Sequence, residues 1–173
     1  MLHDNFSLLA PDLGEGLRVL AFRGTEAIST SYRFEVFFLG EQKAIDEAAA
    51  AVGSGATLQV NGADGSAALA WRGIVEAVEI VEAHGERALY RVELRPRLHR
   101  LTHEVHSRIW VDKDVPAIVK ELLDAATVGH SMALDGTYTA VEHIGQYHET
   151  DFDFVSRRLE REGIHYYFDH EGD

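Results

Sequence analysis

Two segments in the first half of the chain alternate between apolar and polar positions with the period of a β-strand. In residues 32–38 the apolar side chains fall at every second position, and residues 88–95 repeat the pattern. Successive side chains of a strand point to opposite faces, so both segments predict strands with one buried face. Residues 66–71 and 73–80 give two weaker strand signals, and residues 61–65 are typical of a hairpin loop.

Beyond residue 111 the apolar positions take the period of a helix. Asp114 followed by Pro116 is typical of a helix start, and the apolar side chains of residues 118–126 then lie on one helical face. Gly129 is a plausible end for this helix. Residues 137–144 predict another strand.

A second helix is predicted to begin after Thr150. Thr150 and Asp153 resemble a capping box in which aspartate replaces the usual glutamate or glutamine. Gly163 fits the left-handed residue that closes a helix. The face expected to be buried consists of Phe152, Val155 and Leu159.

These patterns together predict a strand-rich α+β fold. Residues 1–111 are expected to form a barrel-like domain, in which the Ala-rich residues 41–52 form a short helix or a loose connection. Residues 112–173 are expected to begin a second α+β unit. Tyr166, Tyr167 and Phe168 should form a strand whose partner is missing or supplied by earlier residues, and we expect this unit to be truncated because the sequence stops five residues later.

The composition excludes several classes of protein. Sixteen Lys and Arg residues against 29 Asp and Glu residues give a net charge of −13, which disfavours binding to nucleic acid or to an anionic membrane. The absence of cysteine excludes disulfides, thiolate catalysis and cysteine-based zinc sites. No apolar stretch approaches the roughly 20 residues of a spanning helix, and a signal-peptide pattern is lacking, so folding in the cytoplasm is expected.

The histidines invite an enzyme interpretation. His99, His103 and His106 are spaced so that a helix would bring three imidazoles to one face, where they could bind zinc. Residues 105–111 resemble a strand, however, and on an extended chain the three rings scatter. Surface or hydrogen-bonded histidines are therefore favoured, and a metal-dependent hydrolase is kept as an alternative.

Acidic residues near the second helix give a second set of candidates for chemistry. Paired carboxylates arise by chance among 29 acids, and the dipole of a helix favours negative charge at its start. We expect Glu149, Asp151 and Glu160 to pair with Arg157, Arg158 or Arg161, or to meet neighbouring subunits. Gly-x-Ser-x-Gly and phosphate-loop motifs do not occur in the sequence. We therefore expect no catalytic, cofactor-binding or metal-binding residues.

A series of blocks between residues 6 and 169 resembles the VgrG spike family of the type VI secretion system. The blocks are Phe22–Ser29, Tyr32–Val36, Gly73–Val75, Tyr90–Pro96, Leu98–Leu101, Arg108–Trp110 and, most specifically, the 23-residue run Gln146–Phe168. The positions that carry the last match are Gln146, Tyr147, Glu149, Thr150, Asp151, Phe152, Phe154, Arg157, Glu160, Gly163, Tyr166, Tyr167 and Phe168. The resemblance implies that these residues form a structural motif.

The resemblance also implies a phage baseplate-hub-like fold and a mechanical function. VgrG-like proteins are trimeric spikes whose hub caps the Hcp tube and helps to deliver effectors, with any enzyme activity in C-terminal extensions. The implied partners are further copies of the chain, the Hcp ring, and effectors, adaptors and a tip protein bound through C-terminal regions. The resemblance also implies that the protein lies in the cytoplasm before the secretion apparatus contracts and is then secreted through that apparatus. The alternative is the baseplate hub or late-control protein of a contractile phage tail.

Overall fold

The chain divides into two compact units. The computed structural model describes residues 5–43, 45–62 and 67–170. Unit 1 consists of Met1–Pro96 and Phe168–Asp173, and unit 2 of Arg97–Tyr167. Unit 2 is therefore an insertion into unit 1, because the chain returns to unit 1 at Phe168.

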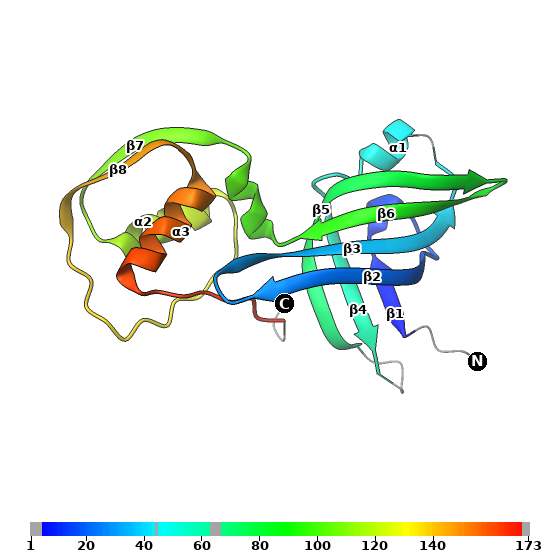
Figure 1. Cartoon of the computed structure of the whole chain (residues 1–173), viewed down its shortest axis with the longest axis horizontal. Helices are drawn as coiled ribbons and strands as arrows, with labels where there is room; N and C mark the ends of the chain where they lie inside the picture. Colours follow the sequence, from blue (N-terminus) through cyan, green and yellow to red (C-terminus); the bar gives the residue numbers. More distant parts are fainter. Residues whose placement is uncertain (1–4, 44, 63–66, 171–173) are drawn as a thin grey trace. The chain divides into compact units, whose positions relative to one another are not determined.

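Unit 1 is a curled, six-stranded antiparallel sheet (Figure 1). The strands lie in the order β1 (Phe6–Leu9), β4 (Gly55–Asn61), β5 (Ala67–His84), β6 (Arg87–Arg95), β3 (Thr30–Glu41) and β2 (Arg18–Ala27). Two short helices, η1 (Pro11–Leu13) and α1 (Ile45–Ala49), lie in the connections. The edge strands β1 and β2 approach each other, with the rings of Phe6 and Phe22 5.1 Å apart, so the sheet forms an incompletely closed barrel.

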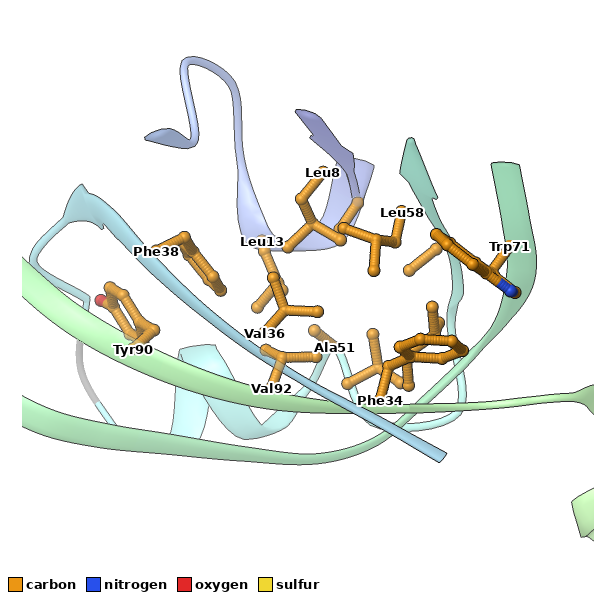
Figure 2. Packing of buried hydrophobic residues seen from close by; sticks show 14 of the residues in the cluster. Leu8, Leu13, Phe34, Val36, Phe38, Ala51, Leu58, Trp71, Tyr90 and Val92 are labelled. Atoms are coloured by element: carbon orange, nitrogen blue, oxygen red, sulfur yellow. The ribbon is translucent and has the colours of Figure 1, made fainter. Parts of the chain in front are cut away.

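The core of unit 1 fills the inner face of this sheet (Figure 2). The inward positions of β3 and β6 are all buried: Tyr32, Phe34, Val36, Phe38, Ala88, Tyr90, Val92 and Leu94. They meet across the two strands, as where Phe38 and Tyr90 stack with ring centroids 5.2 Å apart. The strands predicted from alternation at residues 32–38 and 88–95 are confirmed.

The two weaker strands predicted at residues 66–71 and 73–80 form one long strand, β5. Two bulges, at Val75–Ala77 and Ile80–Glu82, let β5 bend along the barrel wall. A Cβ at Gly73 would lie 2.0 Å from the carbonyl oxygen of Arg95, so the glycine permits a close approach of β6 and does not end a strand. Residues 63–65 of the expected hairpin loop lie outside the described residues.

Unit 2 packs two helices against a two-stranded antiparallel sheet. Its elements are η2 (Arg97–Thr102), β7 (Val105–Lys113), α2 (Val115–Ala125), β8 (Val141–Thr150) and α3 (Asp151–Glu162). Asp114 caps α2 by accepting a hydrogen bond from the Ala117 amide at 2.8 Å. The buried side chains of α2 include Ile118, Val119 and Leu122, as their spacing predicts, but α2 ends before Gly129, with Ala126 as its C-cap.

Three boundaries differ from those expected from the sequence. The division at 111/112 falls inside β7, which pairs with β8 and so belongs to unit 2; the structure divides the chain after Pro96. The strand expected at 137–144 is β8, which begins at Val141 and runs to Thr150. Residues 164–168 form no strand in the described part of the chain, although their side chains alternate between half-buried and exposed.

Candidate structural site at residues 146 to 168

The Gln146–Phe168 block runs from the end of β8 through α3 into the extended segment behind it. At the start of α3, the Asp153 amide donates to Thr150 Oγ1 at 3.0 Å, and the Thr150 hydroxyl donates to Asp153 Oδ2 at 2.7 Å. Thr150 is therefore the N-cap, as predicted. The shorter Asp153 side chain binds the threonine hydroxyl, where the longer glutamate of a capping box reaches back to the N-cap amide.

The end of α3 is closed by a left-handed glycine. Gly163 has φ of 71°, and its amide donates to the Glu160 carbonyl at 3.1 Å. The Ile164 amide donates to the Leu159 carbonyl at 2.9 Å, which completes a Schellman motif. The predicted role of Gly163 is confirmed. Both helix ends are thus fixed by local hydrogen bonds.

The buried face of α3 is rotated from the one predicted. Phe154 is completely buried (0% exposed) together with Val155 and Leu159, whereas Phe152 is only half-buried. Phe154 stacks on Trp110 of β7, with ring centroids 4.9 Å apart and planes 22° apart. The prediction of Phe152 as a core residue is wrong, because α3 turns Phe154 and not Phe152 towards Trp110.

A buried carboxylate joins β7, β8 and α3. Asp151, 9% exposed, accepts a hydrogen bond at 2.6 Å from Arg108 Nη1 and one at 2.8 Å from Gln146 Nε2. Gln146, 2% exposed, also donates to the Glu149 carbonyl at 3.1 Å. A carboxylate this buried requires a cation and hydrogen-bond donors. Asp151 was expected to pair with Arg157, Arg158 or Arg161 or to meet a neighbouring subunit, but its guanidinium partner is Arg108.

The sequence contained a signal for this pair that the prediction did not use. Arg108 lies two positions before Trp110 in the Arg-Ile-Trp block, so a strand places both on one face. Pairing of β7 with β8 then sets Arg108 opposite Gln146 and Trp110 opposite Ile144. The inner face of the sheet therefore presents one charged and one aromatic partner to α3.

The remaining residues of the block lie nearer the surface. Glu149 pairs with Arg157 at 2.5 Å, one of the pairings predicted from the sequence. Tyr147 is 86% exposed, Tyr167 is 72% exposed and Glu160 is also exposed. Tyr166 and Phe168, with Tyr167 exposed between them, are half-buried.

The three histidines considered as zinc ligands are separated by secondary structure. His99 lies in η2 and His106 in β7, so they do not share the face of one helix. The rings of His99 and His103 contact each other, with centroids 5.6 Å apart. His106 Nε2 instead lies 3.3 Å from Glu104 Oε2 and 3.9 Å from Asp151 Oδ2. The structure therefore does not bring His106 together with His99 and His103.

The comparison with protein families decides the identity. Residues 25–173 match the model of the phage tail baseplate hub family (GPD). The chain belongs to this family. The match includes the whole Gln146–Phe168 block and most of the curled sheet of unit 1. The resemblance to VgrG spike proteins, which share this hub domain, is confirmed by the relatives.

Several relatives are spike proteins of type VI secretion systems from Pseudomonas aeruginosa. The chain is 35% identical to VgrG1b over 158 residues, which are 91% of this chain and 21% of that protein. It is 32% identical to VgrG5 over 179 residues, 94% of this chain and 20% of that protein. The chain thus spans about a fifth of the length of these relatives.

Solved structures show the same fold. One is the E. coli c3393 protein, described as a type VI secretion component similar to the T4 bacteriophage tail proteins gp27 and gp5; the TM-score is 0.73 and the identity 26%, over 88% of this chain and 42% of that one. Another is the 43 kDa tail protein of prophage MuSo2 from Shewanella oneidensis, with a TM-score of 0.63 and 15% identity over 92% of this chain and 48% of that one. The strand-rich α+β hub fold expected from the sequence is confirmed. No helix among the described residues is long and apolar enough to span a membrane.

Proposed function

We propose that the chain forms part of the hub of a type VI secretion spike, where it caps the Hcp tube and helps to deliver effectors. The alignment with VgrG1b over 91% of the chain carries this proposal, because it includes both units of the hub fold. The baseplate hub family is structural, and the same fold occurs in a type VI secretion component and in a phage tail protein. The role is therefore mechanical.

The partners follow from this role. We propose a homotrimer in the complete spike, contact with the Hcp ring, and effectors, adaptors and a tip protein bound through other parts of the spike. No nucleic acid and no stable membrane contact are expected, in keeping with a net charge of −13. The protein would stay in the cytoplasm before firing and leave the cell through the secretion apparatus.

We further propose that the chain has no enzymatic activity of its own. One relative is an actin cross-linking toxin, VgrG1 of Vibrio cholerae, but the matching 100 residues are 9% of that protein. In this chain two acids of the motif have structural partners: Asp151 binds Arg108 and Gln146, and Glu149 binds Arg157. Residues 146–163 therefore act as a clamp that fastens α3 to the two-stranded sheet.

The test uses the complete spike protein in its own bacterium. Deletion of its gene should stop the release of Hcp into the medium, and the intact gene should restore it. A spike with Phe154→Ala should fail to restore release because the clamp is weakened, while the Glu149→Gln spike should restore it. Normal Hcp release without the spike would overturn the proposal. Recovery of the protein inside phage tails, bound to a phage tube protein, would support the phage-hub alternative instead.

A further inference from the structure

A row of ion pairs crosses the outer face of the barrel in unit 1. Arg23 of β2 donates to Glu35 of β3. Arg91 of β6 binds the same carboxylate at 2.8 Å and, on its other side, Glu79 of β5 at 2.6 Å. Charges of opposite sign therefore alternate over four neighbouring strands (Figure 1). The row begins with a cation and ends with an anion, and the side chains of Arg23 and Glu79 are 76% and 53% exposed.

The two strands at the ends of this row each carry an exposed aliphatic side chain at a β-bulge. One bulge follows Val19 in β2 and the other follows Ile80 in β5, at the same level of the sheet. The extra residues are Leu20 and Val81, which are 49% and 47% exposed. A bulge re-aims a side chain, so each charged end of the row has an apolar neighbour at the surface.

The two ends differ in the sign of their charge. Residues Arg18–Arg23 include two arginines and no acid, whereas Glu79–Glu82 include two glutamates and no base. The six side chains at issue are all exposed. We define the basic side as Arg18, Leu20 and Arg23, and the acidic side as Glu79, Val81 and Glu82.

Both sides lie at margins of the sheet. β2 is its last strand, and the ladder between β4 and β5 ends at Gly55 and Ile74. In the described part of the chain, β5 beyond Ala77 therefore has β6 as its ladder partner and no other strand. The core fills the inner face of the curled sheet, so the ion pairs lie on its convex face and the two sides point away from each other. A neighbour that covers one side leaves the other exposed.

We propose that unit 1 carries a head-to-tail interface between copies of the chain, in which the basic side of one copy docks on the acidic side of the next. Leu20 packs on Val81, and the two arginines pair with the two glutamates, so the alternation of charge continues from copy to copy. Two copies that each carry a net charge of −13 repel each other elsewhere, which favours this match. A contact between two different surfaces repeats around a ring. The inference rests on the proposed homotrimer and names the surfaces that build it.

Disulfide formation tests the contact, because the chain contains no cysteine. Leu20→Cys and Val81→Cys chains with different tags are mixed and oxidised. Random collision gives as many mixed as like dimers, whereas docking should raise the mixed dimers at least about fivefold over like dimers, the ratio that corresponds to about 1 kcal/mol. The matched control is Ile28→Cys, another exposed aliphatic position of unit 1, which should give the random ratio in place of Leu20→Cys. A random ratio for Leu20→Cys would overturn the proposal.

A chain with both substitutions tests the ring. β2 and β5 are three strand spacings apart, about 14 Å, which is too far for a disulfide within one copy. The oxidised chain with Leu20→Cys and Val81→Cys should therefore close into a trimer on a non-reducing gel. A dimer closed by two disulfides would contradict head-to-tail docking.

The charges are tested in the same mixture. Arg23→Glu in the Leu20→Cys chain should return the ratio to the random value. Glu79→Arg in the Val81→Cys chain should then restore the excess of mixed dimers, because an opposite pair again spans the contact. The melting temperature of each chain checks that the barrel remains folded. A lack of restoration between folded chains would refute the assignment of these surfaces.

The release of Hcp distinguishes a failure of this inference from a failure of the proposed function. If the complete spike restores Hcp release but the mixed dimers show no excess, the interface is refuted and the proposed function stands. If the excess appears but deletion of the spike gene leaves Hcp release normal, the proposed function is refuted and the interface between copies stands.

Discussion

Phe154 is expected to contribute more to the stability of unit 2 than any other aromatic residue of α3. Its side chain is fully buried and stacks on Trp110, while two arginines of the same helix lie over its ring, Arg157 at 5.6 Å and Arg158 at 5.4 Å from the centroid. Truncation to alanine would remove the ring, leave a cavity and end the aromatic stack. Phe→Ala at such positions lowers the unfolding free energy by about 3 to 5 kcal/mol.

The half-buried Phe152 provides the matched control, since it lies on the same helix and has the same side chain. Phe152→Ala should lower the unfolding free energy by about 1 kcal/mol, the typical effect of a substitution outside the core. For a chain of 150 to 250 residues, each kcal/mol shifts the melting temperature by about 2 to 4 °C, so Phe154→Ala should lower it by at least about 6 °C.

Urea unfolding followed by tryptophan fluorescence measures both variants. Trp110 reports on unit 2 directly because it contacts Phe154, and a Trp71→Phe background removes the signal of unit 1. The difference between the two midpoints, multiplied by the slope, gives the free-energy difference. If Phe154→Ala were no more destabilising than Phe152→Ala, the burial of Phe154 against Trp110 would be refuted, and with it the clamp.

Three further outcomes concern side chains of unit 2. Arg108→Met should lower the unfolding free energy by about 2 kcal/mol, because Asp151 loses its cation, and Arg108→Met with Asp151→Asn should recover part of this loss in a double-mutant cycle. Gly163→Val should lower it by about 1 to 2 kcal/mol in the same urea assay, because valine is strained at positive φ. Hydrogen bonds to Glu121, first from Lys113, lower the pKa of that carboxyl. The contribution of ionised Glu121 to the free energy of unfolding is therefore fully present above the ordinary pKa of a glutamate, and it is lost as the pH falls through the pKa in the folded protein. Glu121→Gln should therefore make the free energy of unfolding fall less steeply at acid pH.

Local patterns predicted the elements of this fold well. The alternation at residues 32–38 and 88–95 is a property of each strand alone, and the inward side chains are the buried ones. The caps Asp114, Thr150 and Gly163 act within one turn, so the residues next to them define both helix starts and the end of α3. Such signals require no knowledge of the rest of the fold.

Patterns that depend on a distant partner were less informative. Residues 164–170 alternate between half-buried and exposed positions like a strand, yet they form no strand, and Phe168 packs on the core of unit 1 as a single side chain. Asp151 and Arg108 are 43 positions apart, so no spacing rule within α3 could connect them. Only the pairing of β7 with β8 brings the guanidinium to the start of α3.

The choice between Phe152 and Phe154 shows what a family pattern adds and what it leaves open. Both phenylalanines belong to the motif that resembles VgrG spikes, and either is compatible with an amphipathic helix that includes Val155 and Leu159. Asp151 decides between them, because its bonds to Arg108 and Gln146 fix the rotation of the first turn. With Asp151 turned towards the sheet, Phe154 and Val155 follow three and four positions later on the same face. The buried ion pair therefore sets the orientation of α3, and the aromatic stack on Trp110 is its consequence.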